Sequence, residues 1–99
     1  MESYYNITTE KAEALRIVRS ILSKTIDPDR ITCGDAKCYF PILLDGKHQK
    51  PICRLYFQRK MAIGTISTRK VETRANIQTV REISNYSFEM LTIIKKYIE

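Results

Sequence analysis

Between Arg30 and Ile77 the chain consists of short runs of apolar and β-branched residues that are separated by brief turns. Runs of about four to eight such residues, bounded by glycine, proline or aspartate, are typical of β-strands. The connections are too short for a crossover between parallel strands, so neighbouring strands are expected to be antiparallel. The predicted strands are Arg30–Cys33, Cys38–Leu44, Ile52–Gln58, Met61–Ser67 and Val71–Ile77.

An amphipathic segment lies on each side of this strand region. The first is predicted to begin at Thr8 or Thr9, and its apolar residues recur with helical spacing at Ala14, Leu15, Val18, Ile21 and Leu22. The second opens with a capping box, Thr79-Val80-Arg81-Glu82, and Ser84-Asn85 is a weak point where it could break. Its expected inner stripe is Val80, Ile83, Ser87, Leu91, Ile94 and Ile98.

A chain of 99 residues with no linker is expected to form one domain, residues 1–99, around one modest core. The order of elements predicts an α+β fold, with an antiparallel sheet of four to five strands covered on one face by an N-terminal and a C-terminal helix. The other face is then open to solvent or to a partner. No apolar run approaches the roughly 20 residues that span a bilayer, and an odd number of cysteines without a secretion signal favours a cytoplasmic protein.

Positive charge is concentrated in the middle of the chain. Nine basic residues and a single acid, Glu72, lie between Lys47 and Arg81, and the rest of the chain is slightly acidic. This distribution is expected of a protein that binds an anionic partner. A solvated surface that serves only solubility explains the same pattern, because lysine and arginine are common on any protein surface.

Strict alternation in the segment KPICRLYFQRKMAIGTI predicts which side chains reach the open face. Cys53, Leu55 and Phe57 are expected to face the core, and Ile52, Arg54 and Tyr56 the opposite side, together with Glu72 and Arg74. Gly64 marks either a bulge or a close packing partner. The candidate nucleic-acid-binding residues, with the cations on phosphate and the tyrosine stacking on a base, are Arg54, Tyr56, Arg59, Lys60, Arg69, Lys70 and Arg74. Tyr39 joins them if its strand presents it outward.

Two further patterns resemble catalytic or metal sites. Asp45 followed by Gln58-Arg59-Lys60 mimics the spacing of a metal-dependent nuclease, but a whole strand separates the two parts. A zinc site could use Cys33, Cys38, His48 and Cys53, although the commoner role of such cysteines is that of small core or surface residues. We therefore predict no catalytic residue, no metal and no cofactor, and not an enzyme.

The chain resembles the C-terminal accessory domain of prokaryotic restriction-endonuclease-like proteins, which are related to the R subunits of type I restriction enzymes. The similarity runs from about Thr8 to Tyr97 and includes TTE, IVRSIL, DPDRI, YFPILLDG, and KPICRLYF followed by IG. The resemblance implies an accessory domain that stands without the nuclease half, and it transfers no catalytic residue to this sequence. The chain departs from the family pattern in its basic turn at 59–60 and in RKVETRANI, where a more acidic stretch is expected.

The sequence thus favours a non-catalytic domain that binds nucleic acid, or assists its recognition, in a DNA restriction or defence context. The alternative is a protein-interaction module or a small inhibitor that binds an acidic protein. Tyr4, Tyr5 and Ile7 are expected to pack as a staple on the first helix, or else to contribute to a dimer contact. Neither function involves a membrane.

Overall fold

The computed structural model describes residues 9–34, 36–58 and 60–98, so the predicted staple at residues 4–7 and the side chain of Arg59 lie outside the described part. The elements follow one another as α2 (Thr9–Leu22), η1 (Pro28–Arg30), β1 (Ile31–Cys33), β2 (Phe40–Leu44), β3 (Lys47–Tyr56), β4 (Ala62–Ile66), β5 (Glu72–Asn76), η2 (Val80–Tyr86) and α3 (Ser87–Ile98). Here η marks a short 3-10 helix.

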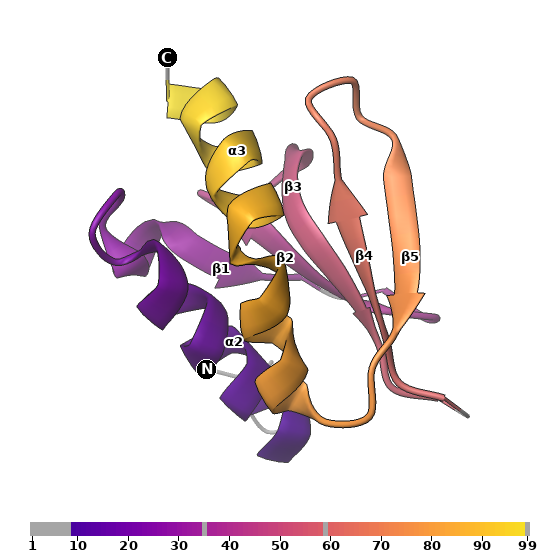
Figure 1. The fold of residues 1–99 in the computed structure, drawn as a ribbon. Coiled ribbons are helices and arrows are strands. Elements are labelled where there is room, and N and C mark those ends of the chain that lie inside the picture. The colour runs from indigo at the N-terminus through magenta and orange to yellow at the C-terminus, as the bar shows by residue number, and fades with distance from the viewer. Residues whose placement is uncertain (1–8, 35, 59, 99) are drawn as a thin grey trace.

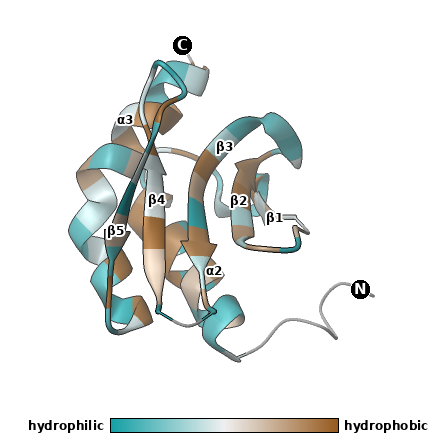
Figure 2. Ribbon diagram, turned by 90° about the vertical axis from the view of Figure 1, so that its right-hand side faces the viewer, coloured by the Kyte–Doolittle hydropathy of each residue, from teal (hydrophilic) through white to brown (hydrophobic). Residues whose placement is uncertain are grey.

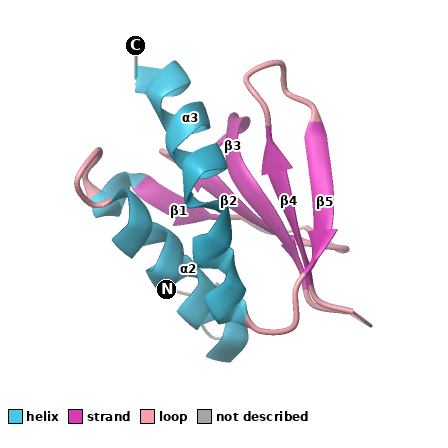
Figure 3. Cartoon of the chain, in the orientation of Figure 1, coloured by secondary structure: helices cyan, strands magenta, loops and turns pink. Residues whose placement is uncertain are grey.

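The five strands form one antiparallel sheet in the order β1-β2-β3-β4-β5, with each strand beside its neighbour in sequence. The helices α2 and α3 lie against one face of the sheet, as Figures 1 and 3 show. Figure 2 looks at the sheet from another side, where the strands lie in front of the helices. The predicted α+β class, the antiparallel sheet and the two covering helices are confirmed. None of the helices in the described ranges is long and apolar enough to cross a membrane.

The core lies between the helices and the covered face of the sheet. From α2 it receives Ala14, Leu15, Val18 and Leu22, which the sequence assigned to the inner side of this helix. Alternate residues of β2 face these side chains, namely Phe40, Ile42 and Leu44. Burial of such aliphatic and aromatic side chains is the main source of stability, at about 25 cal/mol per Å² of apolar surface removed from water.

Strand β3 differs from its predicted form in two ways. It begins at Lys47, before the expected start at Ile52, and its register against β2 shifts between Ile42 and Leu43. Because of that shift Ile52 has no partner residue on β2, and it is buried in the core beside Cys53. The expectation that Ile52 faces the open side was therefore wrong: a β-bulge places one extra residue in the strand and interrupts the alternation.

The C-terminal segment is not one continuous α-helix. Residues Val80–Tyr86 form a 3-10 helix, and the α-helix starts only at Ser87, so the weak point predicted at 84–85 lies within the 3-10 part. The predicted cap is present, since the Glu82 carboxylate accepts the backbone N–H groups of Gln78 and Thr79 at 2.7 and 3.1 Å.

The prediction of the buried stripe of this segment was only partly correct. Val80, Ile83 and Ile94 are buried as expected, but Met90 and Ile93 complete the stripe, whereas Ile98 is exposed. A 3-10 helix has 3.0 residues per turn in place of 3.6, so the residues that follow it are rotated relative to an uninterrupted α-helical pattern.

Stability is expected to fall at alkaline pH, because burial raises the pKa of the Cys53 thiol to about 12 and that of Tyr97 to about 12. In the unfolded chain these groups ionise near about 8.5 and about 10. Their contribution is therefore complete below about pH 8.5 and is lost as the pH rises towards 12.

Urea denaturation at a series of pH values between about 7 and 11 measures this loss as the slope of the free energy of unfolding against pH. Cys53→Ala should reduce this slope. Cys38→Ala, at an exposed thiol, should leave the slope unchanged. Equal slopes for the wild type and Cys53→Ala would contradict the assignment.

Candidate nucleic-acid interface

The open face of the sheet is organised around the carboxylate of Glu72, which lies on the edge strand β5. Its Oε1 atom accepts a hydrogen bond from Nη1 of Arg54 at 2.9 Å, and its Oε2 atom accepts one from the hydroxyl of Tyr56 at 2.5 Å. The Nε atom of Arg74 lies 3.9 Å from the same Oε2. Residues from β3 and β5 are therefore joined across β4 by a single acidic side chain.

Gly64 provides the space for this arrangement. It lies on β4 opposite both Arg54 and Arg74, directly beneath the Glu72 side chain. A Cβ atom at this position would be 2.0 Å from Oε2 of Glu72, far inside van der Waals contact. Of the two roles predicted for this glycine, the structure shows the close packing partner.

Aromatic rings lie beneath both guanidinium groups. The Cζ atom of Arg74 is 4.0 Å from the centre of the Tyr56 ring, and that of Arg54 is 5.2 Å from the centre of the Tyr39 ring. The two rings contact each other at 5.9 Å between their centres, with planes inclined by 48°. We call Tyr39, Arg54, Tyr56, Glu72 and Arg74 the Glu72 cluster. Cation–π contacts of this kind fix the plane of a guanidinium group as well as stabilising it.

The phenol of Tyr56 acts as a hydrogen-bond donor in this cluster. Partial burial and the hydrogen bond to the Glu72 carboxylate both raise the pKa of Tyr56, so the hydroxyl remains protonated at neutral pH. The same oxygen accepts a hydrogen bond from Nη2 of Arg74 at 3.1 Å. One ring face of Tyr56 is covered by that guanidinium group, so stacking of a base on this face requires Arg74 to move.

The two arginines of the cluster differ in their access to solvent. The side chain of Arg54 is 33% exposed and that of Arg74 is 59% exposed, whereas the shared carboxylate of Glu72 belongs to a side chain that is only 20% exposed. Arg74 is therefore the most accessible hydrogen-bond donor of the cluster. With two guanidinium groups and one carboxylate, the cluster carries one positive charge in excess.

The other candidate cations do not join this cluster. Lys60 precedes β4, while Arg69 and Lys70 lie in the turn that follows it, so they are at opposite ends of the strand. The ammonium group of Lys70 donates a hydrogen bond to the backbone carbonyl of Gln49 and lies 5.3 Å from the centre of the Tyr97 ring on α3. Lys70 is thus directed towards α3 and the start of β3.

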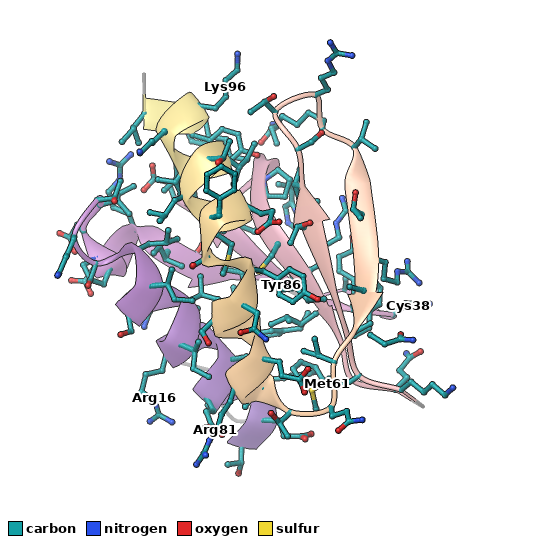
Figure 4. The ribbon with its side chains drawn as sticks, viewed as in Figure 1. Arg16, Cys38, Met61, Arg81, Tyr86 and Lys96 are labelled. Atoms are coloured by element: carbon teal, nitrogen blue, oxygen red, sulfur yellow. The ribbon has the colours of Figure 1, made fainter. Side chains whose placement is uncertain are left out.

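Basic residues are also present on the helical layer. Arg16, Arg81 and Lys96 are exposed and project from α2, η2 and α3, as Figure 4 shows. Arg81 belongs to the basic middle of the sequence, yet the fold places it apart from Arg54 and Arg74. The run of positive charge in the sequence is therefore distributed over several surfaces.

Within its described residues the structure assembles neither the zinc site nor the nuclease-like site that the sequence suggested as alternatives. Cys53 is fully buried in the core, whereas Cys38 is exposed before β2, and no group of at least three potential metal-ligating side chains comes together among residues 9–34, 36–58 and 60–98. Asp45 pairs with Arg30, with 2.8 Å between Oδ2 and Nη2, which lowers the pKa of the carboxyl. The length of β3 separates Asp45 from Gln58.

The central role of Glu72 was not foreseen from the sequence, although its position on the open face was. One signal was present: Glu72 is the single acid among nine basic residues in the stretch 47–81. Its importance depends on the register that places Gly64 opposite Arg74, and such a register between strands cannot be read from a local pattern.

Comparison with known proteins adds no further assignment. The architecture defines the chain as an α+β domain whose antiparallel sheet has a helical layer on one face. No family model matches the sequence, and neither a curated protein nor a solved structure matches it.

Proposed function

We propose that the open face of the sheet binds the phosphate backbone of a nucleic acid, as a non-catalytic recognition domain in a DNA restriction or defence context. The observation that carries the proposal is the arrangement of Arg74: its guanidinium group is stacked on Tyr56, more than half exposed, and only weakly paired with Glu72 at 3.9 Å. An arginine held in one plane loses less conformational entropy on binding phosphate than a mobile one.

The cluster suggests a division of roles on this surface. Arg74 makes the first contact with phosphate. Arg54, which donates a hydrogen bond to Glu72 from strand β3, contributes a second positive charge. Tyr39 and Tyr56 form the aromatic surface between them. A sugar or an unpaired base packs on Tyr56 once the guanidinium group of Arg74 has moved from the ring onto phosphate. The restriction or defence context rests on the sequence resemblance alone.

The test is fluorescence anisotropy with labelled duplex DNA, single-stranded DNA and RNA, at low and near-physiological salt. Arg54→Ala combined with Arg74→Ala should weaken binding by about tenfold or more and flatten the dependence of log K on log salt, because each phosphate contact contributes about 0.9 to the slope on duplex DNA. A thermal melt of the variant checks that it is folded.

The matched control removes two arginines from the helical layer, by Arg16→Ala combined with Arg81→Ala. It changes the net charge equally and should alter binding by no more than about twofold. Equal losses of affinity in the two double variants would show that only overall charge matters. Unchanged binding in the Arg54→Ala, Arg74→Ala variant would show that the open face of the sheet is not the binding surface.

A second candidate function is contact with an acidic protein, and the low excess charge of the Glu72 cluster favours it. Salt weakens both kinds of complex, so salt sensitivity at one concentration does not separate them. A pull-down from lysate treated with nuclease does: an acidic protein that is retained by the wild type and lost in the Arg54→Ala, Arg74→Ala variant supports the protein partner.

A further inference from the structure

The outer edge of β5 has unpaired backbone groups along its length. At one end of the β4–β5 pair the N–H of Ser67 donates to the carbonyl of Val71, and at the other the N–H of Ile77 donates to the carbonyl of Met61. Hydrogen-bonded residues alternate in an antiparallel ladder, so the odd-numbered residues of β5 bond to β4. The backbone N–H and C=O groups of Glu72 and Arg74 therefore point away from the sheet.

The two edges of the sheet differ in how they are protected. At the β1 edge the strand has three residues, and the Nε atom of Arg19 on α2 donates to the carbonyl of Ile31 at 3.0 Å. Among residues 9–34, 36–58 and 60–98, no hydrogen bond reaches the outward backbone of Glu72 or Arg74, and no other element runs beside β5 in Figures 1 and 3. An edge of this kind is a template for another strand.

The sequence of β5 identifies a second copy of this chain as the occupant. We propose that two copies pair antiparallel along β5, in a register centred on Thr73. Glu72 of each copy then lies opposite Arg74 of the other, in the position where the outward backbone groups form hydrogen bonds. The pattern Glu-Thr-Arg is self-complementary only in this register, since a centre at Arg74 would oppose two like charges.

The helix-facing side of β5 supports the same arrangement. Val71 is 59% exposed and Phe88 on α3 is 76% exposed, and both are among the large apolar side chains that are exposed in the described part of the chain. A hollow of about 320 Å³ lies between α3 and the β4–β5 hairpin, lined in part by Thr73, Phe88 and Thr92. In the proposed register Val71 lies opposite Ala75 of the second copy, so pairing covers an exposed apolar side chain.

Pairing along one short strand buries less surface than a typical permanent dimer, so we expect a weak, concentration-dependent association. The pairing joins two sheets into one continuous sheet and places two Glu72 clusters on the same open face. The pairing rests on the backbone edge of β5, whereas the proposed function rests on the exposed guanidinium group of Arg74, which the pairing places beside Glu72 of the second copy.

Disulfide trapping tests the register directly. In this arrangement Thr73 of one copy lies opposite Thr73 of the other, as a non-hydrogen-bonded pair. The Cα atoms of such a pair are about 4.5 Å apart, a separation that a disulfide can bridge. Thr73 is exposed, so Thr73→Cys should fold. Placed in a Cys38→Ser background, which removes the exposed native thiol, it should give a covalent dimer under mild oxidation.

The matched control is Ala75→Cys in the same background. Its side chain points to the same face, but the two copies of position 75 are offset by about four residues, or about 14 Å, which no disulfide spans. At least fivefold more covalent dimer with Thr73→Cys than with Ala75→Cys supports the proposal. Equal trapping of the two, or trapping of neither, overturns it.

Sedimentation velocity of the protein without added cysteines provides an independent measurement. The wild type should show a concentration-dependent shift from monomer to dimer, and Val71→Asp should abolish it, whereas Ile98→Asp, at an exposed apolar residue of α3 outside the proposed contact, should not. A wild type that stays monomeric at all concentrations, or equal effects of both substitutions, would overturn the proposal.

Discussion

Replacing Gly64 by alanine is expected to lower the free energy of unfolding by about 1–2 kcal/mol. Alanine ordinarily suits a strand better than glycine, by about 0.5–1 kcal/mol, so the substitution would stabilise the protein if the site had room for the added methyl group. Here the new Cβ atom would lie 2.0 Å from Oε2 of Glu72 and 2.9 Å from its Cγ, so the whole side chain has to move. The hydrogen bonds from Arg54 and Tyr56 to that carboxylate are then lost.

A double-mutant cycle with Glu72→Ala separates this clash from any other effect at position 64. In the Glu72→Ala background the obstructing side chain is absent, so Gly64→Ala should be neutral or should stabilise the protein by up to about 1 kcal/mol. The measurement is urea denaturation of the wild type, the two single variants and the double variant. If Gly64→Ala costs the same with and without Glu72, the glycine is required for another reason.

The same cluster shows how far the site could be predicted. Alternation along β3 and β5 correctly placed Arg54, Tyr56 and Arg74 on one face, because each of these stretches is regular. The grouping of Lys60, Arg69 and Lys70 with these candidate binding residues had no alternation to support it, because all three lie in turns. The direction of Lys70 depends on Gln49 and Tyr97, which are remote in sequence.

The fold was predictable where its signals are local. The cap at Glu82, the buried residues of α2 and the turn at Asp45-Gly46, where both residues have positive φ of 56° and 70°, can each be read from a few neighbouring residues. The bulge in β3 and the 3-10 helix before α3 could not be read in this way. Both change the phase of a periodic pattern, whereas a reading from neighbouring residues assumes that the phase stays constant.

Ile52→Ala is expected to lower the free energy of unfolding by about 2–5 kcal/mol, as for other large aliphatic side chains removed from a core. The side chain is fully buried and packs with the residues beneath the helices, although simple alternation would place it beside Arg54 on the open face. The bulge therefore converts a position expected to tolerate polar substitution into one of the most sensitive positions in the sheet.

Urea denaturation measures the loss, and Val71→Ala is its control, because that side chain is 59% exposed and its truncation should cost no more than about 0.5 kcal/mol. A loss below about 1 kcal/mol for Ile52→Ala would mean that the alternation of β3 continues through position 52. In that case Cys53 and Leu55 alone would represent this part of β3 in the core. A large loss instead establishes that the bulge adds Ile52 to the core. The strand then returns to regular alternation and presents Arg54, the next residue but one, to the open face as part of the Glu72 cluster.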